Sequence, residues 1–123
     1  MASKNKKQVA QLPNVDDVDK IIHESARLII VANLYLVESA DFLFIMQQSG
    51  LTFGNLSSHM KKLEEAGYVE VQKEFVNRRP RTLLKLKLQG KKAFENYRQK
   101  MKLILDLQGR FHKKMNAFQV ISV

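Results

Sequence analysis

The sequence predicts a mainly α-helical fold that carries one small β-hairpin. Between residues 16 and 66, apolar side chains recur at steps of three and four, the spacing of helices that bury one face. After Gly67 the spacing changes to two and stays so as far as residue 86, as in half-exposed strands. From residue 88 the helical spacing returns. The expected order is therefore three helices, a hairpin and a final helix.

The first helix is expected over residues 16–38. Ser25 is a point where it would break or be capped anew, because serine side chains compete for nearby backbone hydrogen bonds. Residues 28–37 are rich in Leu, Ile and Val, which favours a helix buried on most sides or shared with a second subunit.

Two short helices are expected next. Ser39 is a suitable N-cap for a helix over residues 39–49, which Gly50 would end in the left-handed conformation. Thr52 would cap a third helix, over residues 52–66, with Gly67 as its terminator. The buried stripe of this third helix is expected to consist of Leu56, Met60 and Leu63.

The β-hairpin is expected to have a cationic tip. Its inward side chains would be Val69, Val71 and Phe75 on the first strand, and Leu84 and Leu86 on the second. The turn, residues 77–81, holds three arginines within four positions and a proline that would stiffen it.

The final helix is expected over residues 88–110. Its apolar stripe consists of Phe94, Tyr97, Met101 and Ile104. Such a stripe serves core packing or pairs with the same helix of another subunit, and we favour a dimer interface because the stripe is long for a helix that covers such a small domain.

A chain of 123 residues has room for one domain. We expect a flexible basic arm over 1–14, the folded domain over 15–111 and a tail over 112–123. Cysteine is absent, which excludes disulfides and thiolate metal sites and is typical of a reducing, cytoplasmic compartment. Neither a secretory signal nor an apolar run of about 20 residues is present, so no membrane span is expected.

Charge is distributed unevenly along the chain. Residues 1–50 have a net charge of −1, whereas residues 51–123 carry sixteen basic and six acidic side chains, a net charge of +10. This asymmetry indicates a polyanionic partner for the second part of the chain, although a merely solubilising surface is the plainer alternative.

The third helix is the candidate for reading bases. Short hydroxyls and an amide near the start of a groove-facing helix can both donate to and accept from base edges, and lysines one turn later can reach phosphates. Its candidate DNA contacts are Thr52, Phe53, Gly54, Asn55, Ser57, Ser58, His59, Lys61 and Lys62. At the hairpin tip, Arg78, Arg79 and Arg81 are candidates for the minor groove or the backbone.

The sequence contains no recognisable motif for catalysis or for binding a cofactor. There is no Gly-rich phosphate loop, no Ser/His/Asp set in a recognisable context, and His23, His59 and His112 lack metal-ligand spacing. We therefore expect no enzyme, no metal and no cofactor. A small-molecule effector is left open, since no convergent polar residues mark a pocket for one.

The chain resembles the winged-helix DNA-binding domains allied to the ArsR and MarR transcriptional regulators. The runs that carry the resemblance are HESARL at 23–28, DFL at 41–43, LTFGNLSSHMKKLEEAGYV at 51–69 and RPRT at 79–82. The resemblance implies a winged helix-turn-helix in a homodimeric regulator, with a recognition helix over 52–66 in the major groove and a wing over 76–82. By the same resemblance, Asn55, Ser57, Ser58, His59 and Lys62 match groove contacts, and Arg79 and Arg81 match wing contacts.

Two positions depart from the family pattern. Serine stands at 25 where proline is frequent, and Lys87 stands where a threonine usually caps the last helix, so that helix start is expected to fray or shift. The alternative to a DNA-binding regulator is a winged-helix module that binds another protein without binding specific DNA.

Overall fold

The computed structural model describes residues 14–122, with side chains as far as Leu107. The arm predicted over 1–14 lies outside the described residues except for Asn14, and so do the side chains of the tail predicted over 112–123. Residues 19–97 form one compact unit, which is distinct from the residues that follow Tyr97. In the described part of the chain, no helix has the length and apolar character needed to cross a membrane.

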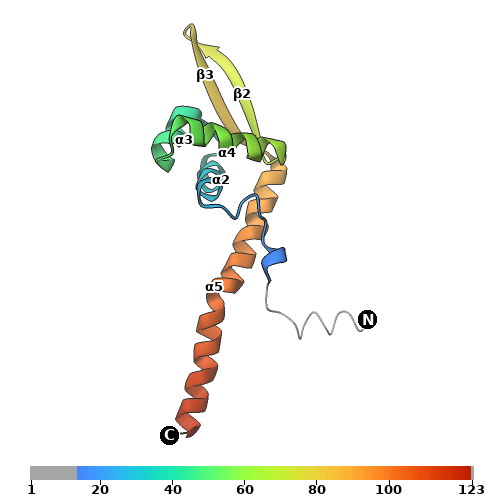
Figure 1. Ribbon diagram of the computed structural model, residues 1–123, viewed down its shortest axis with the longest axis vertical. Coiled ribbons are helices and arrows are strands. Elements are labelled where there is room, and N and C mark those ends of the chain that lie inside the picture. Colours follow the sequence, from blue (N-terminus) through green and yellow to red (C-terminus); the bar gives the residue numbers. More distant parts are fainter. Residues whose placement is uncertain (1–13, 123) are drawn as a thin grey trace, which may run out of the picture. The chain divides into compact units, whose positions relative to one another are not determined.

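The compact unit contains three helices and three strands, which confirms the predicted fold class. They are α2 (Ser25–Val37), β1 (Ser39–Asp41), α3 (Phe42–Ser49), α4 (Phe53–Glu65), β2 (Val69–Val76) and β3 (Arg79–Leu86) (Figure 1). A 3-10 turn, η1 (Val15–Asp17), precedes them, and the long helix α5 (Leu88–Ser122) follows, with its residues 88–97 inside the compact unit. The hairpin of β2 and β3 projects away from α3 and α4 (Figure 1).

The helix predicted over residues 16–38 begins later than expected. The Oδ1 atom of Asp19 accepts hydrogen bonds from the backbone N–H groups two and three residues on, at 2.8 and 3.1 Å, and these bonds hold a turn instead of a helix. Helix α2 begins at Ser25, but its N-cap is Glu24, whose carboxylate accepts from the backbone N–H of Arg27 at 2.8 Å. The serine is thus the first helical residue and not the cap.

The segment after α2 also differs from the prediction. Ser39 does not cap a helix, because Ser39–Asp41 forms strand β1, which pairs antiparallel with β3 and gives the sheet the order β1-β3-β2. The cap of α3 is Asp41, whose Oδ1 atom accepts from the backbone N–H of Leu43 at 2.7 Å. Gly50 ends this helix in the left-handed conformation, at a φ of 72°, as predicted.

The hairpin turn is shorter than the sequence indicated. Only Asn77 and Arg78 lie between the strands, with φ angles of 52° and 64°, the geometry of a tight two-residue turn. Pro80 therefore belongs to β3, where it lies opposite Phe75. Phe75 was expected to point into the core but is 78% exposed, because it lies near the tip.

The core of the unit lies where α2, α3, α4 and the base of the hairpin meet. Its fully buried side chains are Ile22, Ile30, Val31, Leu34, Ile45, Leu56, Leu63, Val69 and Leu84. The predicted stripe of α4 is confirmed, since Met60 is 3% exposed and the two leucines are fully buried. This stripe fixes which residues of α4 can face outward.

Helix α5 runs beyond the predicted end near residue 110, as far as Ser122. Gly109 lies within it, since a glycine in a helix costs only about 0.5–1 kcal/mol relative to alanine. The start of α5 is held by backbone bonds despite the missing threonine. The N–H of Lys87 donates to the carbonyl of Tyr68, and the N–H of Lys91 donates to the carbonyl of Lys87, both at 2.9 Å.

Candidate nucleic-acid interface

Helix α4 begins at an exposed, well-capped end. Thr52 has extended backbone, and its Oγ1 atom accepts from the backbone N–H of Asn55 at 3.2 Å, as the sequence predicted. The first turn of a helix also presents N–H groups with a partial positive charge. The residue after Phe53 is Gly54, at which an added Cβ would meet no atom within 4 Å, so the backbone is open to close approach there.

One face of α4 carries exposed polar side chains. Asn55, Ser58 and Lys62 are all exposed, and their spacing of three and four places them in one row along the helix. This row is made of the amide, hydroxyl and ammonium groups that the sequence assigned to base and phosphate contacts. The structure therefore brings these three predicted residues together.

A second face of α4 turns toward the hairpin. Phe53, Ser57 and Lys61 line a groove of about 590 Å³ between the helix and the inner face of the hairpin. The other residues that line this groove are Phe42, Met60, Glu64, Val71, Lys73, Thr82 and Leu84. Phe53 is 65% exposed, and its ring lies 5.1 Å from that of Phe42.

Lys73 and Thr82 in this groove were missed by the sequence analysis. They lie directly opposite each other in the hairpin register, on the same face as Val71 and Leu84. The alternating pattern of the strands already contained this signal, because polar residues that share a face with buried ones must point toward the helix.

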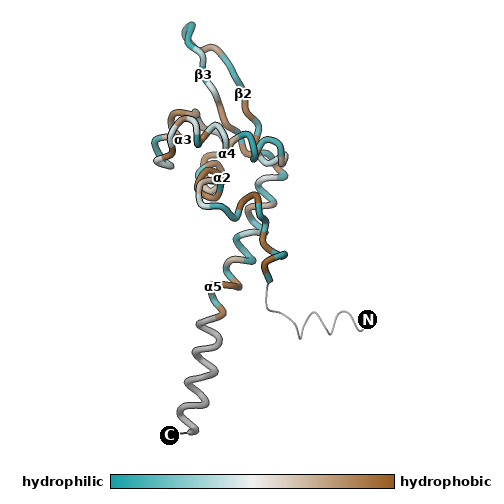
Figure 2. Tube along the Cα trace, viewed as in Figure 1, coloured by the Kyte–Doolittle hydropathy of each residue, from teal (hydrophilic) through white to brown (hydrophobic). Residues whose placement is uncertain are grey.

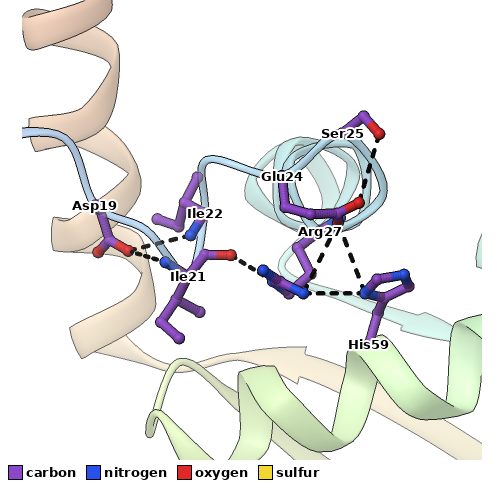
Figure 3. A network of polar contacts seen from close by, with 7 residues as sticks. All are labelled: Asp19, Ile21, Ile22, Glu24, Ser25, Arg27 and His59. Carbon is purple, nitrogen blue, oxygen red and sulfur yellow. Dashed lines mark hydrogen bonds and ion pairs between the residues drawn. The ribbon is translucent and has the colours of Figure 1, made fainter. Parts of the chain in front are cut away.

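His59, one of the predicted DNA contacts, lies partly buried at the side of α4 that faces α2. Its imidazole turns toward the start of α2 and is only 22% exposed (Figure 3). The Nδ1 atom lies 3.2 Å from Nη1 of Arg27 and 3.6 Å from Oε1 of Glu24. This polar cluster ties α4 to α2.

Glu24 is held in its charged form within this cluster. Partial burial alone would raise the pKa of the carboxyl group. It is outweighed by hydrogen bonds from the backbone N–H groups of Arg27 and Ala26 and by the positive charges of Arg27 and of His59 when protonated, so the pKa is lowered. Arg27 itself is 8% exposed, and its Nε atom donates to the carbonyl of Ile21 at 2.6 Å.

The three predicted arginines lie at the far end of the hairpin. Arg78 is in the turn, while Arg79 and Arg81 share the outer face of β3, the face turned away from α4. Figure 2 shows this end as hydrophilic. Arg81 is engaged within the chain, since its Nε atom donates to Oδ2 of Asp41 at 2.9 Å, whereas Arg78 and Arg79 are exposed.

The turn between α4 and β2 is supported from two sides. The hydroxyl of Tyr68 donates to Oδ2 of Asp19 at 2.5 Å, and burial together with this bond and the charge of Asp19 raises the pKa of Tyr68 to about 12. On the other side, Gly90 of α5 packs so closely that a Cβ would collide with the carbonyl oxygen of Tyr68. These contacts fix the exit of α4.

The predicted dimer-interface residues divide into two pairs. Phe94 and Tyr97 are buried within their own chain, where Phe94 packs on Tyr35 and the hydroxyl of Tyr97 bonds to Nδ1 of His23 at 2.8 Å. They leave little surface for a partner. Met101 and Ile104 are half-buried.

Comparison with known families gives a match over most of the chain. The family described as "Winged helix DNA-binding domain" matches residues 26–105. Uncharacterized protein MJ0432 of Methanocaldococcus jannaschii is 41% identical over 78 residues, which cover 63% of this chain and 85% of the relative.

Solved structures share the same fold. A transcriptional regulator homologue from Pyrococcus horikoshii OT3 is 26% identical, with a TM-score of 0.67 over 86% of this chain and 96% of its own. MarR, at 16% identity, has a TM-score of 0.66 over 87% of this chain and 79% of its own. AbfR bound to DNA, at 14% identity, has a TM-score of 0.65 over 98% of this chain and 88% of its own. The chain belongs to the winged helix DNA-binding domain family.

Proposed function

We propose that this protein is a homodimeric regulator of transcription that binds specific sequences of double-stranded DNA. Helix α4 enters the major groove, and the hairpin tip contacts the adjacent minor groove or the backbone. The observation that carries the proposal is the exposed row of Asn55, Ser58 and Lys62 on a helix that buries Leu56, Met60 and Leu63 in the core. A major groove admits one helix and presents donors and acceptors that such side chains can pair with.

Charge supports the same geometry. Arg78 and Arg79 are exposed at the end of a projecting hairpin, where guanidinium groups can enter a narrow minor groove. Lys61 and Lys73 line the groove between the hairpin and α4, and Glu64 is its one acidic lining residue among the described side chains. A duplex that meets both elements would therefore place its backbone next to positive charge.

Dimerisation is the less direct part of the proposal. DNA sites with two-fold symmetry are usually read by two-fold protein dimers. Met101 and Ile104 are the candidates for the interface, because Phe94 and Tyr97 are already used inside the chain. AbfR, whose structure was solved bound to DNA, is also among the proteins that share this fold.

A module that binds another protein is the second candidate. Large apolar side chains are exposed around the end of α2 and on α3, with Leu36 84%, Leu43 58% and Phe44 42% exposed. A surface of this kind suits a protein partner. A chain that ignores every duplex but binds one protein through these residues would favour this candidate over the regulator.

The decisive experiment is selection of bound duplexes from a random pool. The regulator proposal expects a two-fold motif whose half-sites lie about one helical turn apart. Affinity should fall with salt at a log–log slope of about −0.9 for each phosphate contacted. No enriched motif, together with binding that does not depend on salt, would contradict the proposal.

Two variants separate base contacts from backbone contacts. Ser58→Ala should relax base preference in the selected motif and leave the salt slope unchanged, whereas Arg79→Ala should weaken binding to all duplexes and lower the slope by about 1 for each chain on the duplex. Lys85→Ala is the matched control for Arg79→Ala. It removes one exposed positive charge from the same face of β3, but at the base of the hairpin, opposite Glu70.

A further inference from the structure

The HESARL run at 23–28 contributes a buried charge that the proposed function does not use. Among the described residues, Arg27 is the one buried charged side chain, and it lies beneath the recognition helix. The guanidinium is held at two points. Its Nε atom donates to the carbonyl of Ile21 at 2.6 Å, and its Nη1 atom lies 3.9 Å from the carboxylate of Glu24.

The position of this guanidinium determines which nitrogen of His59 carries the proton. Nη1 of Arg27 lies 3.2 Å from Nδ1 of His59. A guanidinium has five N–H donors and no acceptor, so Nδ1 must accept this bond and cannot carry a proton itself. The distance of 3.6 Å from Nδ1 to Oε1 of Glu24 is too long for a competing hydrogen bond. When the ring carries a single proton, that proton is therefore on Nε2.

The Nε2 atom is available to a ligand. In Figure 3 it points away from Arg27 and Glu24. Every buried side-chain nitrogen and oxygen in the described part of the chain has a partner, and Nε2 has none there, so it lies at the surface. Helix α4 therefore presents a single N–H donor whose direction the buried cluster fixes.

We propose that Arg27 and Glu24 are positioning residues that lock His59 in its neutral, Nε2-protonated tautomer, so that it donates one hydrogen bond to duplex DNA. This inference rests on the proposed function. The acceptor is an oxygen of the phosphate backbone or an acceptor on a base edge, which present the same chemistry to an N–H group. A ring free to exchange tautomers would also present an unprotonated Nε2 atom. The lone pair of that atom would repel a phosphate oxygen or an acceptor on a base edge.

The tautomer can be measured without DNA. Long-range ¹H–¹⁵N NMR correlations distinguish a protonated from an unprotonated ring nitrogen, and the signals of His59 are assigned by their loss in His59→Gln. At neutral pH we expect a bare Nδ1 and a protonated Nε2. A proton on Nδ1, or on both nitrogens, would overturn the proposal while leaving DNA binding by the chain untouched.

Two variants of His59 test the contact with DNA. The amide nitrogen of His59→Gln reaches about the place of Nε2, whereas that of His59→Asn reaches only the place of Nδ1. We expect His59→Gln to bind the selected duplex within about threefold of the wild type, and His59→Asn to bind roughly tenfold more weakly for each chain on the duplex. If His59 only ties α4 to α2, the order reverses, because asparagine keeps the contact with Arg27.

Modified duplexes identify the acceptor. A methylphosphonate at one position removes the charge of a single phosphate, and a 7-deazapurine removes one base-edge acceptor. The modification that weakens the wild type but not His59→Asn marks the partner of Nε2. If no position shows this difference, the inference fails, whereas a wild-type chain that binds no duplex at all contradicts the proposed function itself. Thermal unfolding of each variant verifies that it is folded.

Discussion

Substituting Gly90 by alanine should destabilise the protein, although the same change stabilises most helices. Gly90 lies in the first turn of α5, where it is buried against the turn that follows α4. An added Cβ would collide with the carbonyl oxygen of Tyr68 and would lie 2.9 Å from the Cδ1 atom of Leu86. The carbonyl is part of the backbone and accepts the N–H of Lys87, so it cannot rotate away from the methyl group.

The expected magnitude follows from two opposing effects. Inserting a methyl group into a packed site typically costs 1–3 kcal/mol, toward the upper end where the obstacle is backbone. Replacing a helical glycine by alanine returns about 1 kcal/mol. The net loss in the free energy of unfolding is therefore about 2 kcal/mol, which for a unit of this size corresponds to a fall in Tm of about 8–16 °C.

Urea unfolding followed by circular dichroism measures this difference directly. Gly54→Ala is the matched control, because Gly54 lies in the first turn of α4 and an added Cβ meets nothing within 4 Å. Its stability should rise by up to about 1 kcal/mol. If Gly90→Ala were as stable as the wild type, the close approach of α5 to Tyr68 would be refuted.

Three further changes test the supports of the site. Tyr68→Phe should flatten the alkaline limb of the stability curve, because a pKa raised from 10 to about 12 gives stability that is full below pH 10 and lost between pH 10 and 12. An equally steep loss in both proteins would contradict this. Glu24→Gln should unfold at a lower urea midpoint than the wild type at pH 7, and the gap should close below about pH 4.5, because the lowered pKa makes that stability disappear in acid. A constant gap would argue against a lowered pKa. Asp41→Ala should cost about 1–2 kcal/mol in urea unfolding, since it removes the α3 cap and the partner of Arg81, whereas Arg81→Ala should cost at most about 1 kcal/mol. Equal losses in the two variants would mean that the cap contributes nothing.

Local signals in the sequence were sufficient for the parts of the fold that depend on neighbours along the chain. Thr52 caps α4 through a bond to the backbone three residues later, and Gly50 ends α3 by its own left-handed conformation. Both signals are local, so a cap and a terminator can be recognised without knowing the rest of the structure. The same holds for the buried stripe of α4, which follows from the helical period alone.

The failures have a common origin in contacts between distant segments. Strand β1 is only three residues long, and it exists because β3 is there to pair with it. The imidazole of His59 turns toward α2 because Arg27, which lies 32 positions earlier, contacts it, and the helical period alone does not show this contact. Phe75 alternates correctly with its neighbours, yet no helix reaches far enough along the hairpin to cover it. The periodicity of a sequence predicts on which face of a helix or strand a residue lies, but not which other segment packs against that face.

The sheet order β1-β3-β2 leaves β2 as an open edge, with backbone groups that another strand could pair with. Such edges invite two copies of a protein to join through their sheets and aggregate. Here the edge strand reads VEVQKEFV, and its charged residues Glu70, Lys73 and Glu74 would be forced together or desolvated by a second strand. The same strand that forms one wall of the groove therefore also discourages pairing of two copies through their sheets, which leaves the hairpin accessible in a chain with a net charge of +9.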